Sequence, residues 1–575
     1  MRNELLHAYF FFEVKRLKFN EIQSRNQLAD FLGIQRKTLT YVLFEARVES
    51  FYYSFDIPKK DGTLRNIYAP SGALKIIQRK LTNALYEYQT LLRKENGIKA
   101  NVSHAFEKNK SIVSNARIHK NKRFIFCVDL NNFFNSFHFG RVFGYFLSNR
   151  YFNLPKEVAV TIAQIACYKG ILPQGAPSSP IITNLICQAL DIHVLKIAKK
   201  YKLDYTRYAD DLTFSTNNKD FLDKKDEFFE ALKKEIEKSG FSINEEKTRL
   251  IYRDSRQMVT GLVVNHKINV PRDFYRATRA MLHALYTTGE FKVDGEKGTI
   301  AQLEGRLSFI DQIEFYCNKH DISGAKHNYR SLSGKETDYR NFLFYKYFVA
   351  NKQMLLITEG KTDVLYIKAA LKSLYKEYPK LITKDSNGKF RYHLSFFSRS
   401  RHWSYFFGMG LDGADAMKSL YNYFVGKNGL DNLCDYFLKY KTEFSPHPTI
   451  MLFDNEKNTK RPLNKFIGYT ELCELKKEQL EKENYVLLEP NCKLNLVSVP
   501  LPLGKSECEL EDLFSEETLN IEIGGRKFSR KDENPQKYYN KDIFSKYIFQ
   551  NYEKIDFTGF KPLLNILNML NESNG

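Results

Sequence analysis

Two adjacent aspartates, Asp210 and Asp211, lie in the stretch YTRYADDLTFS, between two short segments of alternating apolar residues. This pattern predicts a strand, a tight turn and a second strand, with both carboxylates at the turn. A third aspartate, Asp129, follows the apolar residues of FIFCVDL. If these strands are neighbours, three carboxylates converge, and hard divalent cations such as Mg²⁺ would relieve their repulsion. Two such ions can activate an attacking hydroxyl and stabilise a departing pyrophosphate.

Composition sets the limits for this chemistry. The chain has 575 residues, of which 43% are hydrophobic, which predicts two to four globular domains. The net charge of +21 favours a polyanionic partner such as nucleic acid. The eight cysteines form no CxxC pair, so we expect neither a zinc site nor a disulfide, but reduced buried thiols in a cytosol. We find no run of about 18 apolar residues and expect no membrane contact.

A second group of acidic residues follows two apolar segments in the C-terminal half. Glu359 comes after MLLIT, and Asp454 and Glu456 come after PTIMLF. Because the carboxyl ends of parallel strands meet at one edge of a sheet, we expect these acids to share a crevice. Glu359 could act as a general acid or base while Asp454 and Glu456 hold Mg²⁺. Alternation across Asn455 predicts that Asp454 and Glu456 point the same way, and we interpret Glu511 as an ordinary structural residue.

The first half of the chain resembles reverse transcriptases. The motifs FCVDLNNFFNSF, LPQGAPSSPIITN and YADD are similar, in order and spacing, to palm motifs over about residues 50–320. NARIH and VTG resemble signatures of bacterial retron reverse transcriptases. The resemblance implies a right-hand polymerase with fingers, palm and thumb, two Mg²⁺ ions and dNTP substrates. It also implies that a cognate structured noncoding RNA, primed from an internal guanosine 2′-hydroxyl, is copied into an RNA-linked single-stranded DNA (msDNA) in the bacterial cytoplasm.

The same resemblance implies roles for individual residues. Phe134 would lie under the incoming sugar, where its ring excludes a 2′-hydroxyl and selects dNTPs. Lys247 would assist pyrophosphate departure. The remaining implied nucleotide-binding residues are Gln174, Gly175 and Arg65, and the implied RNA-binding residues are Asn115, His119, Val259, Thr260 and Gly261.

The C-terminal half resembles a Toprim domain, a metal-dependent α/β fold of topoisomerases, some primases and overcoming-lysogenization-defect-type nucleases. The similarity covers about residues 352–460 and depends on EGKTD, which includes Asp363, and on FDNE. It implies a Rossmann-like parallel sheet with Mg²⁺ or Mn²⁺. The implied metal ligands are Glu359, Asp363, Asp454 and Glu456. The sequence reads Asp-x-Glu where the family usually has Asp-x-Asp. We expect nuclease activity, because the chain is too short for a topoisomerase cleavage domain, and family logic implies an antiphage effector controlled in a toxin–antitoxin-like manner by the RNA–DNA product.

These observations predict an α/β multidomain chain. The expected parts are an N-terminal helical region (1–50), fingers and palm (51–270), a helical thumb (271–347), a Toprim domain with a parallel sheet (348–500) and a charged helical extension (501–575). Two alternatives stay open. One is a group II intron-like or diversity-type reverse transcriptase, and the other is a non-nucleolytic RNA-binding scaffold with a structural Toprim fold. The sequence leaves oligomerisation and the nucleic-acid target of the Toprim domain undecided.

Overall fold

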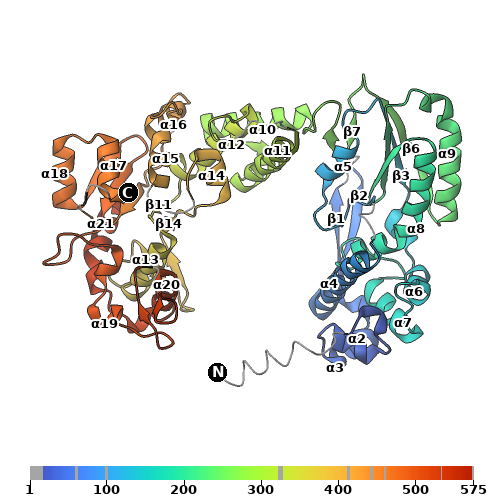
Figure 1. Cartoon of the computed structure of the whole chain (residues 1–575), viewed down its shortest axis with the longest axis horizontal. Coiled ribbons are helices and arrows are strands. Elements are labelled where there is room, and N and C mark those ends of the chain that lie inside the picture. The colour runs from blue at the N-terminus through green and yellow to red at the C-terminus, as the bar shows by residue number, and fades with distance from the viewer. Residues whose placement is uncertain are drawn as a thin grey trace. The chain divides into compact units, whose positions relative to one another are not determined.

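The computed structural model describes residues 17–572, except 59–61, 98–101, 322–327, 411–414, 441–443, 457, 459–460 and 532–533. The chain forms two compact units, Met1–Pro271 and Arg272–Gly575, which we call unit 1 and unit 2 (Figure 1). Each unit is described by itself below.

Unit 1 is built around a four-stranded antiparallel sheet with the strand order β4-β5-β3-β6. In the central strand β3, Phe126, Val128 and Leu130 are buried, as expected for one apolar face of an alternating segment. Helix α9 (Phe221–Lys238) covers this face, and its Phe228 packs edge-on against Phe126 with ring centroids 6.0 Å apart. The strands are β3 (Phe124–Leu130), β4 (Asp204–Tyr208), β5 (Asp211–Thr216) and β6 (Ile243–Tyr252).

Two short hairpins and a set of helices complete unit 1. The hairpins are β1 (Tyr52–Pro58) with β2 (Leu64–Pro70), and β7 (Met258–Val259) with β8 (Leu262–Val263). The helices are η1 (Phe19–Glu21), α2 (Arg25–Phe31), α3 (Arg36–Thr40), η2 (Tyr41–Glu45), η3 (Val48–Phe51), α4 (Gly72–Glu95), α5 (Ile112–Ile118), η4 (Phe133–Ser136), α6 (Phe139–Ser148), α7 (Lys156–Ala166), α8 (Ser179–Lys200) and α9 (Phe221–Lys238).

Helix α8 packs against α4, α6, α9 and strand β4 of unit 1. Among the described residues it alone is long and apolar enough, by length and composition, to cross a membrane. In the structure 56% of the most apolar 18-residue segment of this helix is buried. The helix also contains Asp191, whose buried carboxylate forms an ion pair with Arg207. We therefore interpret α8 as a core helix.

Unit 2 begins with helices that share a hydrophobic core with its sheet. Phe342, Phe344 and Phe348 belong to the same buried cluster as Leu355 and Ile357 of strand β11 (Met354–Ile357). The division between the compact units thus falls at residues 271/272, and the described residues show no break in the core near residue 347, where we expected a further boundary. The first elements are α10 (Arg272–Thr288), β9 (Lys292–Val293), β10 (Glu296–Lys297), α11 (Ile300–Asp321), α12 (Gly334–Phe344) and η5 (Tyr345–Val349).

A five-stranded sheet with the order β14-β11-β15-β17-β16 forms the centre of unit 2. Four of its strands run parallel, and only β16 is antiparallel to its neighbour. Every residue of β11 and β15 is buried, as is typical of parallel strands covered on both faces. The strands are β11 (Met354–Ile357), β14 (Leu394–Phe396), β15 (Thr449–Phe453), β16 (Tyr485–Glu489) and β17 (Leu494–Ser498).

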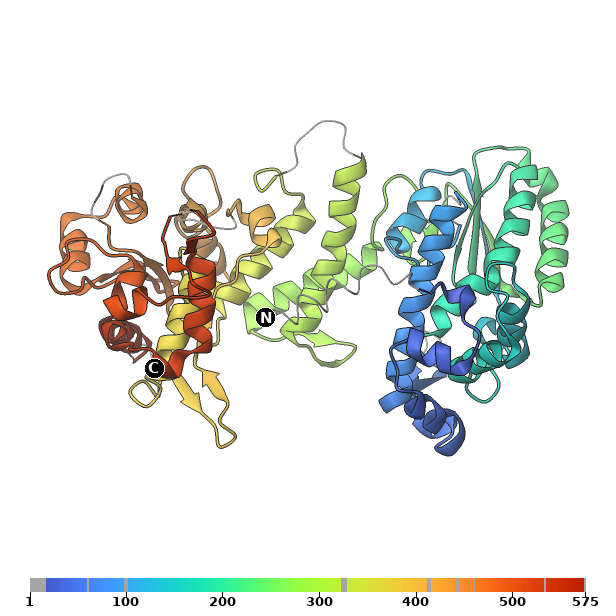
Figure 2. The same ribbon diagram turned by 60° about the horizontal axis from the view of Figure 1, so that its bottom comes forward.

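Helices and short hairpins surround this sheet. The hairpin of β12 (Ile382–Lys384) and β13 (Phe390–Tyr392), yellow in Figure 2, extends away from the sheet. The other elements are α13 (Lys361–Ser373), α14 (Arg401–Phe407), α15 (Asp415–Val425), α16 (Leu433–Leu438), α17 (Pro462–Thr470), α18 (Glu474–Glu483), η6 (Leu510–Leu513), α19 (Glu516–Leu519), β18 (Lys527–Phe528), β19 (Tyr538–Tyr539), α20 (Lys541–Gln550), η7 (Tyr552–Lys554), η8 (Thr558–Phe560) and α21 (Lys561–Glu572).

One expectation about the cysteines is wrong. Cys434 of α16 and Cys492, next to strand β17, form a disulfide with a Cα–Cα distance of 6.5 Å. Their sequence spacing of 58 residues gave no signal, because the fold rather than a local motif brings them together.

Candidate active sites

The three aspartates of unit 1 meet at one end of its sheet. Asp129 is the cross-strand partner of Asp211 in the β3–β5 register. The backbone N–H of Leu130 donates a hydrogen bond to the Asp210 carbonyl at 3.0 Å, which ties the β4–β5 turn to the end of β3. The predicted strand–turn–strand is therefore present, and the predicted neighbour strand carries the third carboxylate.

The turn that carries Asp210 has an unusual backbone. Tyr208 and Asp211 pair across β4 and β5, so that only Ala209 and Asp210 form the loop. Ala209 has a φ of 55°, in the left-handed region that a residue with a Cβ rarely adopts. Such a conformation persists only where surrounding contacts hold it. Here the Nη1 group of Arg207 donates a hydrogen bond to the Ala209 carbonyl at 3.2 Å.

Arg207 is itself fixed by a buried ion pair. Its Nε and Nη2 groups each donate to one carboxylate oxygen of Asp191 at 2.8 Å. Arg207 is 0% exposed and Asp191 is 4% exposed. The Tyr205 hydroxyl donates to Asp191 at 3.1 Å, and Asn184 accepts from Arg207 Nη2 at 3.3 Å. Sequence reasoning missed this network, although a charged residue inside each of two otherwise apolar segments was an available signal.

The electrostatics of the site reflect crowded carboxylates. Burial, together with the negative charge of Asp129, raises the pKa of Asp210. Burial and the charges of Asp210 and Asp129 raise the pKa of Asp211 to about 6. Lys247 Nζ lies 3.4 Å from both carboxylate oxygens of Asp129 and supplies one compensating positive charge.

This oxygen-only, mutually repelling set of acids fits hard divalent cations such as Mg²⁺. Within the described ranges, however, no three His, Cys, Asp or Glu side chains converge closely enough to form a ready-made metal site. Mutual repulsion is a physical reason for carboxylates to stay apart when no cation lies between them. The residues that would hold the cations are Asp129, Asp210 and Asp211.

A cleft of about 670 Å³ opens beside these aspartates. It is lined by Asp129 and Asp210 and by four of the residues to which the sequence resemblance gave a nucleotide-binding role, namely Arg65, Phe134, Gln174 and Lys247. The structure therefore brings together, around one cavity, residues that are as far apart in the chain as positions 65 and 247. Their roles in binding stay predictions.

Gly175 explains how one wall of this cleft is closed. Its φ is 117°, and a Cβ at this position would lie 2.7 Å from the Tyr68 carbonyl oxygen. The neighbouring Gln174 carbonyl accepts a hydrogen bond from the Tyr68 N–H at 3.0 Å. Only glycine allows this close approach between the loop and strand β2 without displacement.

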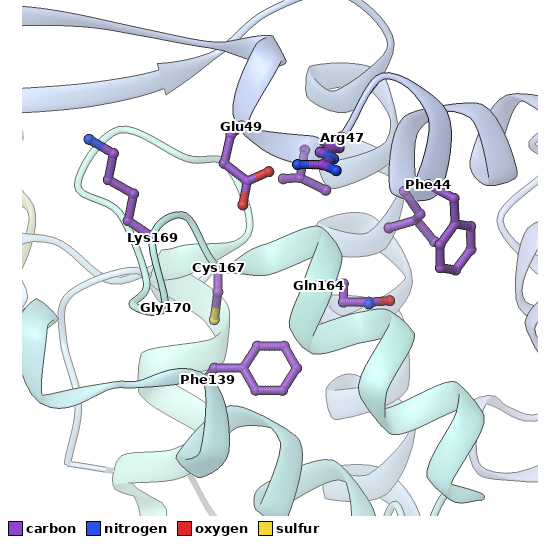
Figure 3. Close-up of a pocket in the computed structure, with 10 residues that line it drawn as sticks. Phe44, Arg47, Glu49, Phe139, Gln164, Cys167, Lys169 and Gly170 are labelled. Carbon is purple, nitrogen blue, oxygen red and sulfur yellow. The ribbon is translucent and has the colours of Figure 1, made fainter.

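A hairpin at residues 168–171 forms part of the cleft wall and also borders a second cavity, of about 350 Å³ (Figure 3). Arg47 and Glu49 lie on one side of this cavity and Phe139 on the other, with Cys167 between them. The Gly170 carbonyl accepts a hydrogen bond from the Phe139 N–H at 2.7 Å, which fixes the hairpin. The second cavity thus lies between residues 43–49, Phe139 at the start of α6, and the hairpin that also lines the cleft.

The NARIH and VTG motifs pack against each other. Thr260 and Gly261 have positive φ values of 47° and 82° and form the two-residue turn of the β7–β8 hairpin. The Thr260 hydroxyl donates to the carbonyl of Ile112, in the first turn of α5, at 3.3 Å. Val259 is buried beneath the turn, and Gly261 is exposed at its tip.

Two residues with an expected RNA-binding role lie in the interior instead. Asn115 and His119 are both 0% exposed. His119 bridges two strands, with Nδ1 at 2.8 Å from the Ser215 hydroxyl and Nε2 at 2.7 Å from the Thr206 hydroxyl. Burial lowers the pKa of His119 to about 3, which keeps the ring neutral. Neither side chain reaches the surface in this structure, and the RNA-binding role of both residues stays a prediction.

In unit 2, Glu359 and Asp454 follow neighbouring parallel strands, β11 and β15. The Asp454 N–H donates to Glu359 Oε1 at 3.1 Å, so the two strand ends are directly connected. Burial and the charges of Asp363 and Glu456 raise the pKa of Glu359 to about 7. Burial and the Glu359 charge also raise the pKa of Asp454 well above its usual range.

Asp363 and Glu511 extend this acidic group. Asp363 caps helix α13 by accepting from the Gly360 N–H at 2.8 Å, and burial together with the Glu511 charge raises its pKa to about 6. Glu511 is 1% exposed and accepts from Lys541 Nζ at 3.0 Å. Its other carboxylate oxygen has no hydrogen-bond partner. Glu511 therefore lies near the acidic group, and its negative charge contributes to the raised pKa values of Asp363 and Asp454.

Glu456 has a different environment from Asp454. Arg461 Nε lies 3.1 Å from its carboxylate, whereas Asp454 accepts a hydrogen bond from the Leu510 N–H at 2.9 Å. The Glu456 charge still contributes to the raised pKa of Glu359. As at the first site, the acids form an oxygen-only set that suits Mg²⁺ or Mn²⁺.

Comparisons with known proteins agree with the geometry of unit 1. The sequence model described as "Reverse transcriptase (RNA-dependent DNA polymerase)" matches residues 57–270. A solved structure titled "Structure of apo telomerase from Candida Tropicalis" is 13% identical with a TM-score of 0.29, covering 51% of this chain and 60% of that one.

Two curated relatives have a higher sequence identity to this chain than the solved structure. The chain is 33% identical over 304 residues to the Retron Ec86 reverse transcriptase of Escherichia coli, covering 53% of this chain and 88% of that protein. It is 32% identical over 320 residues to the Retron Mx162 reverse transcriptase of Myxococcus xanthus, covering 50% of this chain and 64% of that protein. With the carboxylate pair, the turn and the cleft in place, we conclude that this chain belongs to the retron reverse transcriptase family.

Proposed function

We propose that unit 1 copies a cognate structured noncoding RNA into an RNA-linked single-stranded DNA, starting from the 2′-hydroxyl of an internal guanosine. RNA-directed DNA polymerase activity is supported by the family match and the retron relatives. The observation that carries the proposal is the cross-strand pair of Asp129 and Asp211, with Asp210 in the adjoining turn, beside a 670 Å³ cleft. In this proposal residues 51–270 are fingers and palm, and 271–347 are the thumb.

In this mechanism Asp129, Asp210 and Asp211 would hold two Mg²⁺ ions, which supply activation of the attacking hydroxyl and neutralise charge on the leaving pyrophosphate. The Phe134 ring lies in the cleft wall, where it would exclude a ribose 2′-hydroxyl and so select dNTPs. Lys247 is 64% exposed beside Asp129, so its ammonium can reach the leaving group and donate a proton.

The RNA-binding role is assigned differently for buried and exposed residues. The tip of the β7–β8 hairpin, with Thr260 and Gly261, can reach an RNA from the surface. Asn115 and His119 would act by holding α5 under that hairpin, so that their contribution to RNA choice is indirect.

Purified full-length protein with its cognate RNA, dNTPs and Mg²⁺ tests the polymerase proposal. The variant with Asp210→Asn and Asp211→Asn should synthesise DNA at least about a thousandfold more slowly. The reason is that bound metal ions and the electrostatic stabilisation they provide supply most of the rate acceleration in this chemistry. Asp226→Asn is the matched control, because Asp226 is 89% exposed on helix α9. DNA synthesis that persists in the double variant would contradict the proposal.

We further propose that residues 348–500 form a Toprim-type nuclease, which uses Mg²⁺ or Mn²⁺ and acts as an antiphage effector in the bacterial cytoplasm, silenced by the RNA–DNA product. The adjacent ends of β11 and β15, which carry Glu359 and Asp454, support this proposal. Glu359 would act as the general acid or base, because its pKa of about 7 lets it hold or release a proton near neutral pH.

Glu359→Ala separates the two activities. This variant should keep DNA synthesis and lose both metal-dependent cleavage of nucleic acid and toxicity in cells. Glu474→Gln is the control, because Glu474 lies at the surface with a side chain that is 82% exposed. If neither the wild type nor Glu474→Gln cuts single- or double-stranded DNA or RNA, the nuclease proposal fails and a structural scaffold remains.

A further inference from the structure

Unit 2 has a surface on which lysine ammonium groups lie against aromatic rings. Helix α13, the β12–β13 hairpin (yellow in Figure 2), the end of α20 and the edge strand β14 form this surface. The Tyr392 hydroxyl donates a hydrogen bond to the Lys368 carbonyl at 3.2 Å, which ties the hairpin to α13. We call this region the lysine–aromatic surface and define it by Lys368, Lys372 and Lys384 and by the rings of Phe390, Phe396 and Phe549.

One ring of this surface is shared by two lysines. Lys372 Nζ lies 5.7 Å from the centre of the Phe390 ring, and Lys384 Nζ lies 5.1 Å from the same point. Lys372 Nζ is also 4.0 Å from the centre of the Phe549 ring. Attraction to a ring face positions an ammonium group but leaves its positive charge in place. The rings therefore gather positive charge from two elements, α13 and β12.

The lysines of this surface have no acidic partner. Within the described residues, Lys368, Lys372 and Lys384 form no ion pair with a carboxylate. Burial lowers the pKa of Lys368, and burial together with the Lys368 charge lowers the pKa of Lys372. Because a partly buried cation without a counterion is unfavourable, an anion that binds here gains charge-assisted contacts.

The acidic residues next to the surface have other partners. Asp385, in the hairpin loop, accepts hydrogen bonds from the N–H groups of Asn387 at 2.9 Å and Lys389 at 2.8 Å. Glu553 accepts a hydrogen bond from the Tyr552 hydroxyl at 2.9 Å. Neither carboxylate offsets the three lysines by direct contact.

The lysines of α13 form one row. Lys361, Lys368 and Lys372 are separated by seven and four residues, which places them on the same face of an α-helix, about 10 Å and about 6 Å apart along its axis. Lys361 begins α13 two residues after Glu359, and its side chain is 76% exposed, with Nζ 3.7 Å from Asp542. The row therefore begins beside the acidic group of unit 2 and ends on the lysine–aromatic surface.

We propose that the lysine–aromatic surface binds the phosphate backbone of a single-stranded nucleic acid and leads the strand along α13 toward Glu359. The lysines supply counterions for phosphates, and the rings beside them can stack on unpaired bases, a combination typical of single-strand sites. A duplex keeps its bases paired inside and cannot use the rings. The binding stands by itself, whereas the role as a substrate path rests on the proposed nuclease function.

Lysine footprinting tests the surface on the full-length protein. The protein is kept in EDTA, which prevents metal-dependent cleavage. A saturating oligo(dT) of about 20 nucleotides should slow acetylation of Lys368, Lys372 and Lys384 at least about threefold, as measured by mass spectrometry. Lys477 is the internal control, because it lies on α18, which packs against β16 at the opposite edge of the sheet.

A titration that follows Lys368 measures the affinity at this surface alone. In the double variant Lys372→Gln with Lys384→Gln, the oligo(dT) concentration for half-protection of Lys368 should rise at least about fivefold, because two phosphate contacts are lost. Exchange of the same two lysines for arginine keeps the charge and should keep the affinity. Lys477→Gln with Lys482→Gln is the matched control, since it removes equal charge from α18.

Several outcomes would overturn the proposed surface. These are no protection of the three lysines by oligo(dT), equal half-protection in the glutamine variant and the wild type, and stronger protection by a duplex of the same length or by vesicles of anionic phospholipid.

Cleavage in Mg²⁺ then tests the substrate path separately. If the wild type cuts oligo(dT), the glutamine variant should cut it more slowly at subsaturating oligo(dT), and an unchanged rate would refute the path. A wild type that binds oligo(dT) but cuts no nucleic acid would refute the nuclease function and leave the binding surface in place.

Discussion

Asp191 and Arg207 form a bidentate ion pair with two N–O distances of 2.8 Å, and both side chains are buried in the core of unit 1. Because Arg207 also binds the Ala209 carbonyl, this pair positions the turn that presents Asp210 and Asp211. Removing one partner leaves a buried charge unpaired, and removing both does not.

Replacement of Arg207 by Met should lower the free energy of unfolding by about 3–5 kcal/mol, because Asp191 is left buried and uncompensated. The double variant Arg207→Met with Asp191→Leu should recover most of this loss, as measured by urea unfolding. DNA synthesis should stay low in both variants, because neither restores the hydrogen bond to Ala209. Recovery of synthesis in the double variant would show that the ion pair serves stability alone.

Gly175→Ala should raise the KM for dNTP at least fivefold, because the new Cβ would lie 2.7 Å from the Tyr68 carbonyl oxygen and push the loop away from β2. Gly97→Ala is the matched control, since Gly97 also has a positive φ, of 59°, but nothing lies within 4 Å of its added Cβ. Steady-state kinetics of the two variants compare an added Cβ that meets the Tyr68 carbonyl oxygen with an added Cβ that meets no neighbour. Equal KM values would contradict a role for this close approach.

His119→Leu should destabilise the protein by about 1–3 kcal/mol at pH 7, because the Ser215 and Thr206 hydroxyls each lose a partner. The unfolded chain takes up a proton at His119 as the pH falls below about 6.5, whereas the folded chain does so only near pH 3. The free energy of unfolding of the wild type therefore falls as the pH drops through this window. The His119→Leu variant should lack this part of the pH dependence.

Urea unfolding of the wild type and His119→Leu at pH 7 and pH 5 measures the difference. The gap between the two proteins should shrink at pH 5. RNA affinity measured under folded conditions should change little if His119 acts only through packing, and a large loss of affinity in a stably folded variant would restore a direct role.

Glu359→Gln should stabilise the protein at pH 8 in EDTA. The carboxyl of Glu359 loses its proton near pH 4.5 in the unfolded chain but near pH 7 in the folded chain. Folding therefore takes up a proton between these values, and stability falls as the pH rises from about 4.5 to about 7. Over this pH window the free energy of unfolding of the wild type should fall by about 2–3 kcal/mol relative to that of Glu359→Gln.

Metal addition supplies the complementary measurement. Mg²⁺ or Mn²⁺ in place of EDTA should raise the Tm of the wild type at pH 8, because a cation bound only by the folded state compensates the crowded acids. Glu359→Gln should respond less, and Glu474→Gln should respond like the wild type. A metal response that is identical in all three proteins would argue against ligation at Glu359.

The sequence predicted the local elements of both sites better than their wider surroundings. Alternation around Asp210 and Asp211 predicted the strand–turn–strand, and the family motifs predicted residues that line one cleft, because these signals are local or depend on known spacing. Asp191 and Arg207 were missed, since a buried ion pair depends on a tertiary contact that periodicity does not encode.

Other differences have the same origin. Asn115 and His119 sit in a motif that suggests RNA contact, but burial is decided by how α5 packs against β4, which the motif alone does not reveal. Glu511 joins the acids of unit 2 because strand β15 and the segment at residues 508–510 are connected through Asn455 and Asp454. The disulfide between Cys434 and Cys492 likewise depends on tertiary proximity.

The common core of the helices at 272–349 and strand β11 has a practical meaning for domain exchange. A chimera joined at residue 347 would strip Phe342, Phe344 and Phe348 of their partners and expose aromatic surface on both fragments. A junction at 271/272 leaves that core whole. Grafting the C-terminal part onto another polymerase therefore requires carrying its helices along.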